Sequence, residues 1–110
     1  MKVLQITMPD NSVWEVPAVL VAESRAKYYA AKDTGSTEGE AYERSLAEEL
    51  EYTLRDEDEI TDWAANNMNW SDVEAHAKIV TAAPELNDDD KQEGWCNGDK
   101  RVIDRPDDSP

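Results

Sequence analysis

The single histidine and the single cysteine, His76 and Cys96, are the side chains best suited by type to catalysis. Nucleophilic catalysis requires an activated serine, cysteine or threonine beside a base, and a Cys–His pair would meet this need if the two segments lay side by side. No motif surrounds either residue, and a lone cysteine usually packs as a small hydrophobic side chain. We therefore expect His76 on the surface and no catalytic site.

Metal and nucleotide binding have equally little support. Two soft ligands cannot complete a tetrahedral zinc site, which needs four cysteine, histidine or carboxylate groups. Asp56, Asp58 and Asp62 are spaced like part of a calcium loop, but Ile60 and Thr61 stand where an oxygen ligand and the turn glycine are required. None of the four glycines forms a phosphate cradle. The sequence predicts a non-enzymatic protein without metal or cofactor.

The acidic side chains are the most informative chemical group. They number 26 against 11 basic residues, for a formal net charge of −15, and residues 33–74 alone hold fourteen acids and two bases. A field of this sign repels nucleic acids and anionic membranes and attracts surfaces rich in lysine and arginine. The same acids could also serve only to keep the protein in solution. We expect a basic protein partner and no direct binding to nucleic acid or membrane.

Simple features of the chain bear on compartment and domain organisation. Apolar residues make up 39% of the chain but form no run of the about 20 residues needed to cross a bilayer. The N-terminal MKVLQITMPD leaves no space for the apolar region of a signal peptide, and one cysteine cannot form an intrachain disulfide. We expect a cytoplasmic protein in which residues 1–103 form one domain and residues 104–110 a flexible acidic tail.

The N-terminal residues alternate in the manner of a β-hairpin. Residues 2–7 and 12–16 flank the turn-forming residues 8–11. Because side chains of a strand alternate between its two faces, one apolar face is expected to point to the core. That face consists of Leu4, Ile6, Trp14 and Val16.

Three helices are expected to follow the hairpin. Pro17 suits the first turn of a helix over residues 18–32. Its inward stripe would be Leu20, Ser24, Tyr28 and Ala31, with Val21 beside it. Residues 37–40, Thr-Glu-Gly-Glu, have the form of a capping box, so a second helix should begin there. Its apolar side would be Tyr42, Leu46, Leu50 and Leu54.

The third helix should begin with the acidic residues 56–59 and end near Met68, because carboxylates stabilise helix N-termini. The tryptophans in and around these elements are expected to be core residues, since each ring buries a large area.

The C-terminal third is expected to return to β-structure. Residues 73–81 alternate apolar and polar side chains, which favours a strand, although residues 71–74 could instead cap a helix. Residues 87–90, Asn-Asp-Asp-Asp, are typical of a solvated loop. Asn97-Gly98 is the strongest local signal for a hairpin turn, so residues 93–103 should form a second hairpin.

These elements together predict an α+β fold. It would contain an N-terminal β-hairpin, three helices, and a C-terminal strand and hairpin, with the strands in one antiparallel sheet packed by the helices.

Nine acids on the second helix and at the start of the third are the candidate partner-binding residues. A helix rises about 1.5 Å per residue, so an acid every three or four residues gives a sparser version of the duplex DNA array of about one charge per 1.7 Å. Since such acids repel one another, charge reversal at Glu48, Glu49 and Glu51 should leave the fold intact. The set comprises Glu43, Glu48, Glu49, Glu51, Asp56, Glu57, Asp58, Glu59 and Asp62.

Three segments, MKVLQITMPDNSVWEVP, DWAANNMNW and EGWCNGDKRV, together with the size and acidity, resemble small phage- or prophage-encoded proteins of unknown function. Among these, the chain is similar in charge to anti-CRISPR and anti-restriction inhibitors, some of which present carboxylates where a defence complex expects DNA phosphates. The resemblance implies a DNA-mimic inhibitor that occludes a basic nucleic-acid-binding surface of a host defence complex in the bacterial cytoplasm. The alternatives are a phage structural or assembly protein, or a regulator of a host enzyme through ordinary protein–protein contact.

Overall fold

The computed structural model of the chain describes residues 1–81 and 88–104, and its fold is α+β, as the sequence predicts. Its elements in chain order are β1 (Lys2–Thr7), β2 (Val13–Pro17), α1 (Ala18–Thr34), α2 (Glu40–Leu54), α3 (Glu57–Asn67), α4 (Trp70–Val73), the 3-10 turn η1 (Glu74–His76), β3 (Lys78–Thr81), α5 (Asp88–Asn97) and β4 (Lys100–Asp104).

The four described strands form one antiparallel sheet in the order β3-β2-β1-β4. β1 pairs with β2 in the predicted hairpin, where Ile6 lies opposite Trp14, and β1 also pairs with β4, where Leu4 lies opposite Val102. The hairpin turn is closed by Asn11, which adopts a left-handed φ of 71° that asparagine tolerates better than most residues. The first and last described strands are therefore neighbours, with β1 inside the sheet and β4 at its edge.

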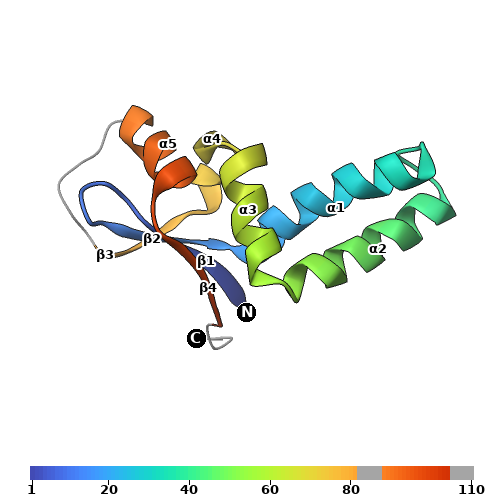
Figure 1. The fold of residues 1–110 in the computed structure, drawn as a ribbon, viewed down its shortest axis with the longest axis horizontal. Coiled ribbons are helices and arrows are strands. Elements are labelled where there is room, and N and C mark those ends of the chain that lie inside the picture. The colour runs from blue at the N-terminus through green and yellow to red at the C-terminus, as the bar shows by residue number, and fades with distance from the viewer. Residues whose placement is uncertain (82–87, 105–110) are drawn as a thin grey trace.

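The helices are arranged in two parts (Figure 1). α3, α4 and α5 lie on one side of the sheet, whereas α1 and α2 run side by side and extend away from it. The resulting molecule is elongated, with principal extents of 47 × 33 × 22 Å. The ammonium group of Lys2 on β1 donates a hydrogen bond to the carbonyl of Leu54, which ties the end of α2 to the sheet.

The hydrophobic core lies between the sheet and α3–α5. Leu4, Ile6 and Val16 are fully buried, as predicted, and Trp14 is packed against them with part of its surface exposed. Trp70 forms an edge-on contact with Trp14 at 5.5 Å between ring centroids and a tilted contact with Trp95 at 6.2 Å. The buried indole of Trp95 donates to the carbonyl of Met68 over 3.1 Å. Trp70 is therefore a core residue and not part of an exposed apolar patch.

The first three helices occur where the sequence predicts them, but two details differ. The predicted inward stripe of α1 is wrong at Tyr28, which is 53% exposed, whereas Val21 is buried and Leu20 packs against the core. The buried side chains are Ala18, Val21, Ala22, Arg25, Ala26 and Ala30. Small side chains let α1 approach α2 closely. The capping box at Thr37 does not form either. Gly39 is the N-cap of α2, with φ of 100°, and the Glu38 amide donates to the Ser36 hydroxyl within the preceding loop.

The predicted C-terminal hairpin is wrong in its first half. Residues 93–97 belong to α5, and the Gly98 amide donates to the Gly94 carbonyl over 2.8 Å, so Asn97-Gly98 ends a helix instead of forming a hairpin turn. Residues 88–90, predicted as a solvated loop, are the first turn of α5, while Asn87 and the predicted tail beyond Asp104 lie outside the described residues. β4 instead pairs with β1.

The predicted strand over residues 73–81 is confirmed in part. Val73 ends α4, residues 74–76 form the 3-10 turn, and only Lys78–Thr81 pair with β2. The helix start lies at Asn69, whose amide donates to the Asp72 carboxylate over 2.8 Å. This contact extends the helical structure through residues whose alternation favours a strand.

Candidate functional site

The nine predicted partner-binding acids divide into an exposed group and a structural group. Glu49, Asp56 and Glu59 are partly buried and make contacts that hold the fold together. The other six are exposed: Glu43, Glu48, Glu51, Glu57, Asp58 and Asp62.

Glu49 and Glu59 bind the buried arginine of α1. The side chain of Arg25 is only 10% exposed, and its Nη1 lies 3.4 Å from Glu49 Oε1 while its Nε lies 3.2 Å from Glu59 Oε2. Nη1 also donates to the hydroxyl of buried Thr53 over 3.0 Å. The guanidinium carbon lies 4.5 Å from the Tyr29 ring centroid, which is within the range of a cation–π interaction. Two of the nine acids are thus partners in a network that joins α1, α2 and α3.

This network changes the expectation for charge reversal. A lysine at position 49 would place a second positive charge beside Arg25, in an environment that screens charge less than water does. Charge reversal at Glu49 should therefore destabilise the protein, unlike reversal at the exposed acids.

Two more acids make contacts at the start of α3. Asp56 is the N-cap, and its Oδ1 accepts from the amides of Asp58 and Glu59 over 3.1 and 3.3 Å. Glu57 Oε1 accepts from the amide of Val102 over 3.1 Å. Because β4 is an edge strand of the described sheet, this amide has no neighbouring strand to bond, and Glu57 satisfies it.

The outward surface of α2 carries charges of both signs. By helical spacing, residues 40, 44, 48, 51 and 55 share one stripe, in the order Glu, Arg, Glu, Glu, Arg. Arg44 pairs with Glu40 and Arg55 pairs with Glu51, each over 3.8 Å and each highly exposed. Residues 56–67, in contrast, contain five acids and no basic residue. Of these two helices, α3 therefore has the more purely acidic surface.

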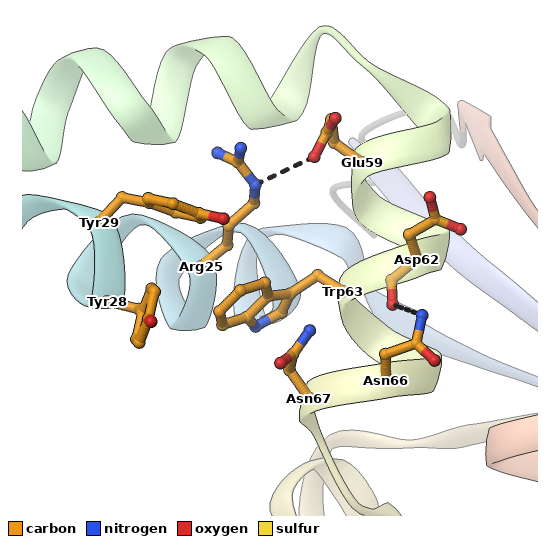
Figure 2. A pocket seen from close by; sticks show the side chains of 8 residues that line it. All are labelled: Arg25, Tyr28, Tyr29, Glu59, Asp62, Trp63, Asn66 and Asn67. Carbon is orange, nitrogen blue, oxygen red and sulfur yellow. Dashed lines mark hydrogen bonds and ion pairs between the residues drawn. The ribbon is translucent and has the colours of Figure 1, made fainter. Parts of the chain in front are cut away.

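A pocket of about 450 Å³ lies where α1 meets α3, as Figure 2 shows. Its wall on α1 consists of Arg25, Tyr28 and Tyr29. Its wall on α3 consists of Glu59, Asp62, Trp63, Asn66 and Asn67.

The aromatic side chains of this pocket are held in a defined arrangement. The Trp63 indole donates to the Ser24 hydroxyl over 3.0 Å, which fixes the ring. Tilted contacts join Trp63 to Tyr28 at 5.5 Å and to Tyr29 at 5.9 Å between ring centroids. The amide nitrogen of Asn66 donates to the Asp62 carbonyl, so its side-chain oxygen is the part available to accept a hydrogen bond. Ring faces, amide oxygens and carboxylates suit a cation.

The sequence did not reveal this pocket, since Tyr28 and Trp63 were both expected in the core. One feature of the sequence does indicate that one of the two tyrosines lies outside the core. Tyr28 and Tyr29 are adjacent on a helix and hence about 100° apart, so a narrow buried stripe cannot hold both.

His76 and Cys96 are placed on different elements. His76 is exposed on η1, and the Cys96 thiol on α5 accepts from Gln92 Nε2 over 3.2 Å. Within residues 1–81 and 88–104, no group of three or more histidine, cysteine, aspartate or glutamate side chains is arranged to hold a metal ion. No helix in this described part is long and apolar enough to cross a membrane.

No protein-family model, curated protein or solved structure matches the chain.

Proposed function

We propose that the chain is a non-enzymatic binding protein that occludes a basic, nucleic-acid-binding surface of a host protein or complex, in the manner of a phage-encoded DNA-mimic inhibitor of the anti-CRISPR or anti-restriction type. The observation that supports this most directly is the acidic surface of α3. Glu57, Asp58 and Asp62 are exposed there, Glu59 is partly exposed, and no basic residue lies between positions 56 and 67.

Helix stability accounts for only part of this surface. Acids in the first turn of a helix interact favourably with its dipole, but that effect falls off beyond the first turn. Glu57, Asp58 and Glu59 are in the first turn of α3, whereas Asp62 lies beyond it. Helix stability therefore does not account for the exposed carboxylate of Asp62, whereas binding to a basic partner does.

The position of the surface also suits binding. α3 lies between the sheet and the projecting α1–α2 hairpin (Figure 1), and α2 adds exposed Glu43 and Glu48. A concentrated field of one sign steers a basic partner and raises its association rate.

The test uses the immobilised full chain and a bacterial lysate. We expect it to capture a DNA-binding protein, duplex DNA to displace that protein, and capture to weaken steeply between low and moderate salt. The variant Glu43→Lys, Glu48→Lys, Asp58→Lys should capture at least about tenfold less, because those acids are exposed.

A matched variant controls for net charge alone. Asp33→Lys, Glu38→Lys and Glu74→Lys change the charge by the same amount at exposed positions outside α2 and α3. Capture that survives high salt, DNA competition and the first variant would contradict the proposal.

One observation favours the alternative of ordinary protein–protein contact, as in a phage assembly protein or a regulator of a host enzyme. Ile79 and Val80 on the edge strand β3 are 43% and 46% exposed. If Ile79→Thr and Val80→Thr abolish capture while the charge reversals do not, this alternative replaces the acidic-surface proposal.

A further inference from the structure

We infer that the pocket between α1 and α3 receives an arginine side chain of the partner. This inference rests on the proposed function, because it names the group on a basic protein that the acidic surface of α3 would select.

The pocket has an excess of negative charge. Arg25 in its wall already binds both Glu49 and Glu59, so its positive charge is more than balanced. Asp62 adds a third carboxylate with an exposed side chain. The two carboxylates that Arg25 binds and that of Asp62 in the wall outnumber its one guanidinium, so a second cation would be attracted where an anion would be repelled.

The pocket also offers aromatic surface to a cation. Tyr28 stands at the exposed side, and Trp63, the aromatic residue with the strongest cation–π interaction, lies against it. The hydrogen bond from Trp63 to Ser24 holds the indole in place before binding, which lowers the entropic cost of association. Arg25 in the pocket wall already lies over the rings of Tyr29 and Tyr52, so the fold itself contains the cation–π interaction that we propose for the partner's arginine.

The acceptors favour arginine over lysine. Figure 2 shows Asn67 beside the Trp63 ring, whereas the Asp62 and Asn66 side chains project from another side of α3. All three residues belong to the pocket wall. A guanidinium carries five N–H donors in a flat fork and can stack on a ring while donating to oxygens at its edge. An ammonium group is a point charge with three donors and does not stack in this way. A volume of about 450 Å³ lies within the range of pockets that hold small ligands, so the pocket is large enough for a guanidinium group.

The test is a titration of the isotope-labelled full chain by nuclear magnetic resonance, reading the Trp63 indole N–H and the Tyr28 ring. The probes are N-acetyl-arginine amide, N-acetyl-lysine amide and the neutral isostere N-acetyl-citrulline amide. We expect saturable shifts with arginine at about 1–10 mM, clearly weaker binding of lysine and none of citrulline. The buried Trp95 indole serves as an internal reference that should not shift.

A matched pair of variants tests the site itself. Asp62→Asn should weaken arginine binding by about fivefold, since it removes one carboxylate of the wall. Asp33→Asn removes an exposed carboxylate of α1 that lies outside the pocket wall and should leave binding within about twofold.

Three results would overturn the inference: no saturable arginine shift, equal shifts with citrulline, or no loss with Asp62→Asn. Equal affinity for lysine would replace the arginine assignment with a general cation site. Failure of the proposed function is a separate result, because it appears as lysate capture that survives charge reversal at Glu43, Glu48 and Asp58. Those positions lie outside the pocket, so the titration does not depend on them.

Discussion

The sheet half of the molecule, formed by the β-sheet with α3, α4 and α5, and the helical hairpin, formed by α1 and α2, are held together by different interactions. In the sheet half, large apolar side chains such as Leu4, Ile6 and Trp95 are fully buried. In the hairpin, α1 buries mostly alanines and α2 buries only Thr53, and the charged Arg25 lies between the helices. The stability of the sheet half therefore depends on apolar burial, and that of the α1–α2 hairpin depends on one polar network.

The two halves are expected to open at different free energies. Regions with few buried apolar contacts unfold locally at lower free energy than the core. We expect the hairpin, away from α3, to open before the sheet does. α3 belongs to both halves, because Ile60 and Ala64 lie in the core while Glu59 binds Arg25.

The largest effect is expected in the sheet half. Trp95→Ala should lower the free energy of unfolding by about 3–5 kcal/mol, because it removes a fully buried ring and leaves a cavity. The variant also leaves the Met68 carbonyl without the indole donor. Urea denaturation followed by circular dichroism measures this change. A loss below about 1.5 kcal/mol would mean that the tryptophan core does not dominate stability.

The second-largest loss of stability is expected at Arg25, at the centre of the α1–α2 hairpin. Arg25→Met should cost about 2–3 kcal/mol, somewhat less than the loss of a fully buried ion-pair partner, because Glu49 and Glu59 remain partly exposed. Adding Glu49→Gln and Glu59→Gln should recover part of that loss, since no unpaired carboxylate then remains. Denaturation of the single and triple variants gives the comparison. A triple variant less stable than the single one would show that the charges themselves are not the source of the cost.

A matched leucine pair compares the two halves directly. Leu4→Ala removes a fully buried side chain from β1 and should cost about 2–5 kcal/mol, whereas Leu46→Ala on the partly exposed face of α2 should cost about 1 kcal/mol. Both values come from the same denaturation measurement. Equal losses would remove the distinction between an apolar sheet half and a polar hairpin.

The parts of the fold that the sequence predicts are those with local signals. The N-terminal hairpin follows from alternation around a turn, and the start of α3 follows from Asp56, whose side chain caps the helix as expected. The inward face of α1 does not follow, because apolar residues occupy several sides of that helix and packing against α2 and α3 selects among them.

α5 shows how tertiary contacts override a local signal. Asn97-Gly98 is typical of a hairpin turn, yet here Gly98 follows a helix whose end lies against Thr7, Met8 and Pro9, where β1 enters its turn. A Cβ at Gly98 would lie 2.3 Å from the Thr7 carbonyl oxygen, and a Cβ at Gly94 would lie 2.3 Å from the Met8 sulfur. The absence of a side chain at these two positions lets the end of α5 approach β1 and its turn closely.

The candidate site was likewise predictable only in part. The spacing of the acids predicts an exposed surface, and six of the nine are exposed. The pairing of Glu49 with Arg25 joins residues 24 positions apart on different helices, and no local pattern indicates it. The pocket has the same origin, because Tyr28 and Trp63 meet only when α1 and α3 pack.

The smallest effect is a pH dependence that belongs to the sheet half. Burial at the start of β4 lowers the pKa of Lys100 below its ordinary value, and the charges of Cys96 and Asp99 offset part of that shift. Between the lowered pKa and the ordinary value of 10.5, the unfolded chain binds more protons than the folded one at this position. The contribution of Lys100 to stability therefore rises with pH in that window and is constant below it. Lys100→Met should remove this rise. Denaturation midpoints of the unmodified protein and of this variant, from neutral pH to about pH 10.5, would measure the difference. Lys78→Met, at an exposed position, controls for the loss of one positive charge. If the Lys100 variant keeps the slope of the unmodified protein, the pH dependence arises elsewhere and burial at this end of β4 carries no measurable cost.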